Sequence, residues 1–128
     1  PEGFTYPDGM DVEVFSFQLL ERATHEAKKP SEREHVTHYF WQNPQLFSTY
    51  RIDLDKDFSA YRLTVDYPED LEVTEAIIYG LYSKDPLFTM HDIIKFLDIN
   101  PGLKEKNSCF RSNAGWQSAY QKDKQVGF

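Results

Sequence analysis

The sequence predicts an α/β fold, because short alternating stretches are followed by stretches with helical periodicity. The clearest transition lies at residues 61–71. There Leu63 and Val65 alternate with polar residues, which is typical of a strand with one buried face. From Leu71 to Tyr82 the apolar residues follow the helical period instead. We expect this strand to be central and the rest of the chain to be organised around it.

The helix at residues 71–82 should pack one face against this strand. Its expected inward positions are Leu71, Ile78 and Leu81, which recur at helical spacing. Full burial of such a side chain contributes roughly 1.5–3 kcal/mol. Truncation of Ile78 to alanine is therefore expected to cost on the order of 2–5 kcal/mol.

Asp66 closes the predicted strand directly before this helix. With Glu69 it has the spacing of a capping box, and Asp is among the preferred N-cap residues. The loop after the carboxyl end of a strand is also where α/β proteins bind ligands. A carboxylate there suits Mg²⁺, which is usually held by one or two carboxylates plus substrate phosphates. The residues alone leave the helix cap and the metal ligand both open.

Composition indicates one globular domain in a reducing compartment. The 128 residues are 40% hydrophobic and 16% aromatic, which suffices for a real core. A net charge of -7, with no run of Lys or Arg, argues against nucleic acid as a partner. The lone Cys109 provides neither a disulfide framework nor a cysteine metal site. Because no apolar run approaches the roughly 20 residues of a membrane span, we expect a cytoplasmic protein without a membrane partner.

The first strand is expected at residues 11–15, where polar and apolar residues alternate strictly. Val12 and Val14 would share one face, and Asp11 and Glu13 would lie on the other beside an aromatic ring. Two carboxylates next to an aromatic side chain fit either a solvated edge or the wall of a polar pocket. Both interpretations stay open.

Two helices are expected in the following stretch. The first covers about 16–29, begins at the cap Ser16 and is ended by Pro30. The second covers about 31–42 and starts with a Ser-x-x-Glu capping box. The residues expected to face inward are Phe17, Leu20, Ala23 and Ala27 in the first helix and Val36, Tyr39 and Phe40 in the second.

The remaining elements are a strand, a helix and a polar tail. Residues 46–54 alternate and predict a third strand. A helix is expected at 89–99, capped by Thr89 with an acidic residue three positions on. Residues 103–113 have no regular pattern, and 115–125 form a polar tail with some helical potential.

No short motif assigns a chemistry by itself. The chain contains no glycine-rich phosphate loop, nucleophile elbow or paired-His zinc motif. His35 and His38 lie three residues apart, but a third ligand nearby is missing, which argues against zinc. A helix surface or the lining of a polar pocket is the better interpretation of this pair.

Three segments carry a resemblance to a known family: DGMDVEVFS at 8–16, SEREHVT at 31–37 and LTVDYPEDLE at 63–72. In this order, and down to residues 113–116, the chain resembles the C-terminal half of the cytidylyltransferases of the spore-coat polysaccharide biosynthesis protein F type. These are similar to acylneuraminate and Kdo cytidylyltransferases. The string TVDYPEDLE is the most specific part of the resemblance.

The resemblance implies a nucleotide-diphospho-sugar transferase fold, Rossmann-like, with a mixed sheet and helices on both faces. It implies an enzyme that makes a CMP-sugar and pyrophosphate from CTP and a sugar acid, with Mg²⁺, for surface polysaccharide biosynthesis. By resemblance, Asp66 is the catalytic metal ligand contributed by the C-terminal half. Asp11, Glu13, Glu34 and His35 match positions where the family's sugar-binding side and dimer contacts are assembled.

The resemblance also implies that residues 1–128 are a single domain from which the N-terminal nucleotide-binding half is absent. That half carries the family's basic nucleotide loop and another metal-binding Asp. We therefore expect the complete enzyme, a homodimer, to use CTP and a sugar acid, and these residues alone to be inactive. A second hypothesis is a non-catalytic α/β module for dimerisation or interaction. In either case, the expected association patch comprises Tyr39, Phe40, Trp41, Leu46 and Phe47.

Overall fold

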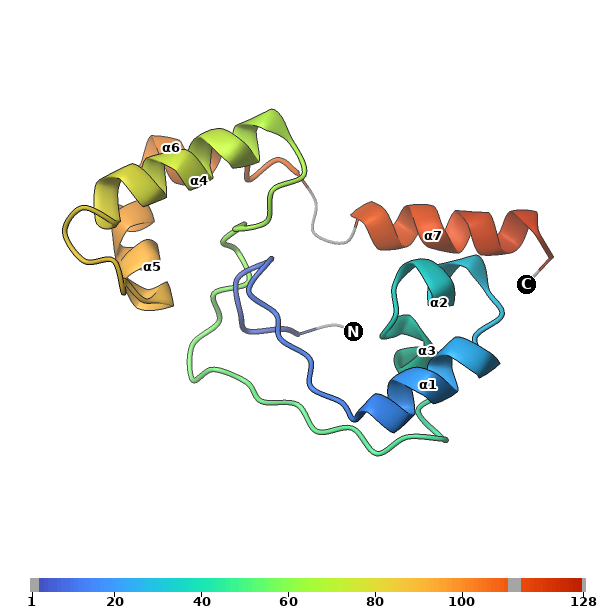
Figure 1. Ribbon diagram of the computed structural model, residues 1–128. Helices are drawn as coiled ribbons and strands as arrows, with labels where there is room; N and C mark the ends of the chain where they lie inside the picture. The colour runs from blue at the N-terminus through green and yellow to red at the C-terminus, as the bar shows by residue number, and fades with distance from the viewer. Residues whose placement is uncertain (1–2, 111–113, 128) are drawn as a thin grey trace. The chain divides into compact units, whose positions relative to one another are not determined.

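A computed structural model describes residues 3–110 and 114–127, with the side chains of 114–118 outside the description. Asn113 and the Trp116 side chain, which the resemblance includes, therefore lie outside the described part. The chain divides into two compact units, residues 1–11 with 53–112 and residues 12–52 with 113–128. Each unit is built from two stretches that are distant in sequence (Figure 1).

The first unit is a small helical assembly. Its helices are α4 (Pro68–Leu81), α5 (Met90–Ile99) and α6 (Pro101–Lys106), and α4 packs on both of the others (Figure 1). The predicted irregular stretch from 103 thus begins inside a helix, because Pro101 ends α5 and also occupies the first turn of α6. The buried apolar core of this unit consists of Tyr61, Val73, Ile77, Ile94 and Leu97.

The predicted inward face of α4 is wrong by about one position. Val73 and Ile77 are buried, whereas Leu71 is 49% and Ile78 is 45% exposed. Leu81 is partly buried against the core as expected. The reason lies at Gly80, where a side chain would overlap the ring of Phe96. Because Gly80 lets α4 lie against the Phe96 ring of α5, the stripe that contains Val73, Ile77 and Gly80 can turn inward.

Carboxylates one turn inside α4 and α2 (Pro30–Glu34) cap these helices. At α4, the backbone N–H groups of Asp66 and Tyr67 donate to Asp70 Oδ2 at 3.0 and 3.1 Å. At α2, the N–H groups of Lys28 and Lys29 donate to Glu32 Oε2 at 3.0 and 3.1 Å. The capping box of Asp66 with Glu69, and the one that began at Ser31, are therefore wrong, because the N-cap of α4 is Tyr67, one residue after Asp66, and the N-cap of α2 is Lys29, two residues before Ser31.

The described residues contain no strand, only an isolated parallel bridge between Asp8 and Arg62. The N–H of Asp8 donates to Tyr61 O at 2.9 Å, and the N–H of Leu63 donates to Asp8 O at 2.7 Å. Pairing then stops because the chain turns at once. Gly9 has a φ of +92°, and a side chain there would collide with the backbone of Thr64.

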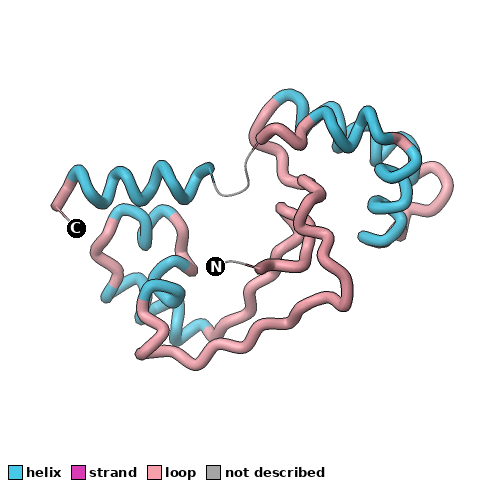
Figure 2. The backbone as a smooth tube through the Cα atoms, turned by 180° about the vertical axis from the view of Figure 1, so that it is seen from behind, coloured by secondary structure: helices cyan, strands magenta, loops and turns pink. Residues whose placement is uncertain are grey.

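The predicted strands at 11–15, 46–54 and 61–65 are therefore not regular strands within the described part of the chain (Figure 2). Alternation tells which side chains share a face, but a strand also needs a neighbour for its N–H and C=O groups. The mixed sheet of the expected fold is accordingly not found in these residues.

The second unit contains α1 (Phe17–Glu26), α2, α3 (His38–Gln42) and α7 (Ala114–Gln125). Ser16 caps α1 as predicted, with its hydroxyl accepting from the Leu19 N–H at 3.4 Å. The expected helix at 31–42 is broken, because His35 ends α2 in an extended conformation with φ -116° and ψ 92°. The α7 helix packs on α2, and the predicted polar tail is thus helical (Figure 1).

The predicted association patch is not one exposed surface, because Tyr39, Phe40, Trp41 and Phe47 belong to the core of the second unit, whereas Leu46 is 47% exposed. Tyr39 and Phe40 are buried together with Ala23 and Ala27, and Trp41, Phe47 and Leu19 pack around them. Three rings meet edge to face: Tyr39–Phe47 at 5.6 Å and Phe40–Phe47 at 5.0 Å between centroids. Of the side chains expected inward, Phe17 is 69% and Val36 is 46% exposed.

The length and apolar character of the helices can be compared with what a membrane-spanning helix needs. In the part of the chain that the structure describes, no helix combines the length and apolar character needed to cross a bilayer.

Candidate functional site

Asp66 lies just before α4 with an accessible carboxylate. Its Oδ2 accepts a hydrogen bond from Arg62 Nη2 at 2.8 Å. The Asp66 side chain is nevertheless 62% exposed, whereas that of Arg62 is only 7% exposed. The predicted metal ligand is therefore held at one oxygen and open to solvent.

Arg62 is the centre of a buried charge cluster. Its Nε donates to Asp70 Oδ1 at 2.9 Å, and its Nη2 donates to Asp70 Oδ2 at 2.9 Å. Its Nη1 donates to Asp8 Oδ2 at 3.1 Å. The hydrogen bonds to Asp70 contribute most to raising the pKa of Arg62 above its ordinary value, against the opposing effect of burial.

Asp70 is committed entirely to this cluster and to the helix start. Its side chain is 0% exposed. Asn107 Nδ2 donates to Asp70 Oδ1 at 2.9 Å and also to the backbone carbonyl of Arg62 at 3.2 Å. The hydrogen bonds from Arg62 hold the pKa of Asp70 far below its ordinary value, outweighing burial. Asp70 is therefore ionised and has no lone pair to spare for a metal ion.

Two stacked aromatic rings lie near the guanidinium. Tyr67 and Phe110 stack with centroids 4.1 Å apart and an interplanar angle of 14°. The Arg62 Cζ lies 5.6 Å from the Tyr67 centroid and 5.9 Å from the Phe110 centroid. These distances are in the range of cation–π attraction, which further confines the guanidinium.

The donor set fits Mg²⁺ only as part of a shared site. No three His, Cys, Asp or Glu side chains among the described residues gather so as to hold a metal ion. Asp66 offers one accessible carboxylate, and Mg²⁺ is commonly bound by one or two carboxylates completed by waters and substrate phosphates. A single accessible carboxylate suits Mg²⁺ that is shared with substrate phosphates, and it does not suit a site in which the protein supplies all the ligands.

The structure divides the other predicted site residues between the two units. Asp11 belongs to the unit that contains Asp66, whereas Glu13, Glu34 and His35 belong to the other. Asp11 and Glu13 are exposed. Glu34 Oε2 accepts from Lys122 Nζ at 2.7 Å, a hydrogen bond that lowers the pKa of Glu34.

His35 lies beside a second, buried histidine. The ring centroids of His35 and His38 are 5.3 Å apart, and His38 Nε2 lies 2.9 Å from the Tyr120 hydroxyl. Burial, and secondly the proximity of His35, lower the pKa of His38, although carboxylates at Asp123, Glu13 and Glu32 oppose this. Of the two interpretations, the lining of a polar interior describes His38 better than a helix surface does.

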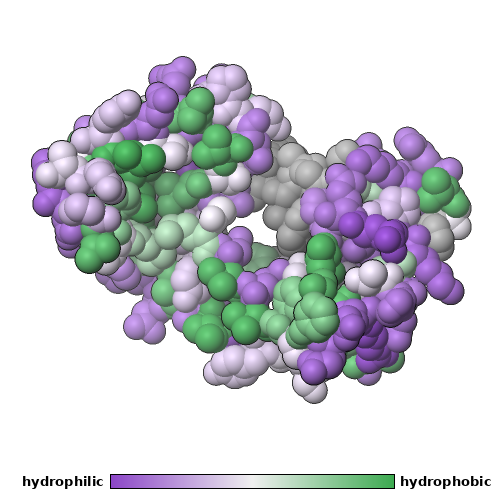
Figure 3. Space-filling view, viewed as in Figure 1, coloured by the Kyte–Doolittle hydropathy of each residue, from purple (hydrophilic) through white to green (hydrophobic). Residues whose placement is uncertain are grey.

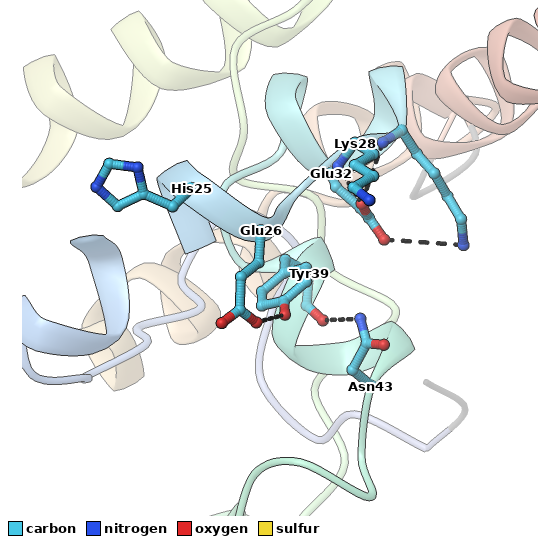
Figure 4. Close-up of a pocket in the computed structure, with 7 residues that line it drawn as sticks. His25, Glu26, Lys28, Glu32, Tyr39 and Asn43 are labelled. Atoms are coloured by element: carbon cyan, nitrogen blue, oxygen red, sulfur yellow. Dashed lines mark hydrogen bonds and ion pairs between the residues drawn. The ribbon is translucent and has the colours of Figure 1, made fainter. Parts of the chain in front are cut away.

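An open depression of about 550 Å³ in the second unit contains none of the predicted site residues. Its charged groups largely pair with one another or with neighbours. Glu26 accepts a hydrogen bond from the Tyr39 hydroxyl (Figure 4) and another from Arg22 Nε, outside the depression. Glu32 caps α2, and His25 lies apart from the Glu26–Tyr39 pair. The residues that line the depression are His25, Glu26, Lys28, Lys29, Glu32, Tyr39 and Asn43.

Sequence reasoning missed Arg62, Asp70 and Asn107 as parts of the site. One signal was available for Arg62, which lies four residues before Asp66 on the same alternating stretch. The capping role of Asp70 follows from counting three residues after Tyr67 rather than after Asp66. Nothing in the sequence indicates Asn107, because it lies 37 residues from Asp70 and only the fold brings them together.

Comparison with known proteins points to one enzyme class. The chain is similar to the solved structure of a cytidylyltransferase from Leptospira borgpetersenii, with 33% identity and a TM-score of 0.72 over 84% of this chain. It is 34% identical over 110 residues to an uncharacterised protein of Methanocaldococcus jannaschii, covering 83% of this chain. No protein-family model matches. At this TM-score and identity, the chain shares the fold of the matched part of the cytidylyltransferase. It spans 44% of the length of each of these two proteins.

Proposed function

We propose that this chain is the C-terminal part of a cytidylyltransferase that makes a CMP-sugar and pyrophosphate from CTP and a sugar acid. The observation that carries the proposal is the similarity to a cytidylyltransferase at a TM-score of 0.72 and 33% identity. The TVDYPEDLE string and the exposed Asp66 within it support the spore-coat type, similar to acylneuraminate and Kdo cytidylyltransferases. The enzyme would act in the cytoplasm, for surface polysaccharide biosynthesis.

In the proposed reaction a sugar hydroxyl oxygen attacks the α-phosphorus of CTP. A new P–O bond forms, the bond from the α-phosphorus to the bridging oxygen breaks, pyrophosphate leaves and the hydroxyl proton is released. Asp66 would hold Mg²⁺, which would neutralise charge that develops on the phosphates. The protein contributes mainly positioning and a fixed electrostatic environment to such a transfer.

The remaining part of the complete enzyme would supply the nucleotide-binding loop and another metal-binding Asp. This division is supported by the charges around Asp66. The Arg62 guanidinium already donates to Asp8, Asp66 and Asp70, so its charge is not available as a cradle for a triphosphate. We therefore expect residues 1–128 alone to lack turnover.

We further propose that Asp11, Glu13, Glu34 and His35 serve the sugar-binding side or the dimer contacts. The exposure of Asp11 and Glu13 leaves them accessible for either role. A homodimer is supported by apolar side chains of the second unit that are open to solvent. Val12 is 84%, Val14 93%, Tyr50 92% and Ile52 69% exposed.

The test uses the full-length protein with CTP, Mg²⁺ and a panel of sugar acids that includes Kdo and N-acetylneuraminate. We expect pyrophosphate release with at least one of them. Asp66→Asn should lower turnover by several orders of magnitude, because it removes a charged metal ligand. Its melting temperature should change little, since Asp66 does not cap α4.

Glu69→Gln is the matched control, because it removes a neighbouring carboxylate in the first turn of α4 that is not part of the charge cluster. It should retain wild-type turnover. Wild-type turnover of Asp66→Asn at saturating Mg²⁺ would show that Asp66 is not the ligand. Absence of pyrophosphate release with every sugar acid would favour the alternative, a non-catalytic module for dimerisation or interaction.

A further inference from the structure

We propose that Arg62 is a positioning residue that fixes the Asp66 carboxylate in the orientation that binds Mg²⁺. The inference rests on the proposed function, in which Asp66 is the metal ligand. It is carried by one shared donor group: Arg62 Nη2 donates to Asp66 Oδ2 at 2.8 Å and to Asp70 Oδ2 at 2.9 Å. The exposed carboxylate is thus tied to a buried one through a single guanidinium nitrogen.

The guanidinium is itself held from several directions. Asp70 binds it through two oxygens, and Asp8 binds its Nη1 at 3.1 Å. Asn107 holds both the Asp70 side chain and the Arg62 carbonyl. Arg suits this task because its planar fork binds carboxylates in a fixed geometry, which an ammonium group does not.

Asp66 depends on the hydrogen bond from Arg62 for a fixed orientation, because its side chain is not buried as that of Asp70 is. Its side chain is 62% exposed, whereas Asp70 is fully buried. A mobile carboxylate would lose rotational freedom when it binds a metal ion, which weakens binding. Holding Oδ2 in advance removes part of this cost and leaves the other oxygen for the ion.

The positive charge of Arg62 does not oppose a cation here. One guanidinium and three carboxylates, those of Asp8, Asp66 and Asp70, leave the cluster with an excess of negative charge. Arg62 therefore orders the ligand without making the site electropositive.

The test compares Arg62→Lys with Val73→Ala in the full-length protein. Lysine keeps the charge but cannot bind Asp70 through two atoms and Asp66 at once. Val73 is 1% exposed in the core of the same unit, so Val73→Ala lowers stability without touching the cluster. The readouts are Mn²⁺ affinity in the presence of CTP, by electron paramagnetic resonance, together with kcat and KM for CTP.

We expect Arg62→Lys to weaken Mn²⁺ binding roughly 10–100-fold and to lower kcat similarly, as loss of an outer-shell partner does. KM for CTP should change less than kcat, and Val73→Ala should keep wild-type values for the folded protein. If Arg62→Lys does not fold, Asn107→Ala replaces it. This variant loosens both Asp70 and the Arg62 carbonyl and should weaken Mn²⁺ binding several-fold.

Wild-type Mn²⁺ affinity and kcat in the folded Arg62 variant, or in Asn107→Ala if it is used, would overturn the inference while leaving the proposed function intact. A wild-type protein that neither binds Mn²⁺ with CTP nor releases pyrophosphate would instead overturn both. An Arg62→Lys variant whose losses equal those of Val73→Ala would show a merely structural role and would also overturn the inference.

Discussion

At the scale of single residues, the chemistry is concentrated in one arginine and the carboxylates it joins. Asp66 and Asp70 lie four residues apart and share Arg62 Nη2, yet one is exposed and the other fully buried. This difference separates their roles. The buried carboxylate starts a helix and anchors the arginine, whereas the exposed one is accessible for binding.

The pKa of Asp70 predicts acid sensitivity. Because its folded pKa is lowered from 3.8, the stabilisation is present above the unfolded pKa and is lost as the pH falls from about 4 toward the folded value. Asp70→Asn should cost roughly 3–5 kcal/mol at pH 7, the effect of breaking a buried pair. Urea unfolding at pH 7 and at several values below 4 checks both points.

The pH dependence supplies the internal control for this prediction. In Asp70→Asn the loss of stability between pH 4 and pH 2.5 should be smaller than in the wild type, because the group that takes up the proton has been removed. Equal acid sensitivity of the two proteins would mean that other carboxylates dominate, and that Asp70 is not the main acid-sensitive group of the cluster.

At the scale of elements, α4 shows how a short helix is oriented by its neighbours. Adjacent isoleucines on this helix differ sharply: Ile77 is 5% and Ile78 is 45% exposed. Gly80 permits the close approach to Phe96 that sets this rotation. The two isoleucines therefore form a matched pair for testing which face of α4 is buried.

Ile77→Ala should cost about 2–5 kcal/mol of unfolding free energy, because it leaves a cavity among Val73, Ile94 and Leu97. Ile78→Ala should cost about 1 kcal/mol or less, as a partly exposed side chain does. Chemical denaturation of the 128-residue chain measures both. A larger cost for Ile78→Ala would show that the face expected from periodicity is the buried one after all.

At the scale of the whole molecule, two compact units each bury their own apolar residues and still leave others open. Figure 3 shows hydrophobic surface interspersed with hydrophilic surface on one face of the chain. In the second unit the largest exposed fractions belong to Val14, at 93%, and Tyr50, at 92%. Exposed apolar side chains of this kind mark interaction surfaces in many proteins.

If the proposed dimer forms through this surface, Val14→Lys combined with Tyr50→Lys should shift sedimentation velocity profiles toward the monomer. Two charges placed in a desolvated interface are strongly unfavourable. Leu87→Lys is the control, because Leu87 is also largely exposed, at 84%, but belongs to the other unit. A wild-type chain that stays monomeric at high concentration would contradict the prediction.

Much of the helical structure was predictable because its signals are local. Ser16 and Thr89 cap α1 and α5 as their sequence patterns indicate, with Asp92 completing the cap of α5. The helix predicted at 71–82 is also present, as α4, which begins at Pro68 within the TVDYPEDLE string. Capping and helical periodicity depend on residues within one or two turns, so a sequence contains the information needed to recognise them.

The strands were less predictable because pairing is not local. Alternation at 11–15, 46–54 and 61–65 describes side chains, whereas a strand depends on the hydrogen bonds of a neighbouring segment. The described chain provides one such bridge, between Asp8 and Arg62, and the turn at Gly9 ends it. The inward face of α4 depended in the same way on Phe96, which lies on another helix.

The sequence by itself determined the caps of α1 and α5, the acidic character of the chain and the position of Asp66 before a helix. Only the tertiary structure decided which carboxylate is buried and which stays exposed, because Arg62 and Asn107 bind Asp70, and Asp8 binds Arg62, from separate parts of the chain. A local pattern can place a charged group beside a helix. Whether that group is desolvated, and whether it stays ionised in spite of desolvation, depends on partners that only folding brings within hydrogen-bond distance.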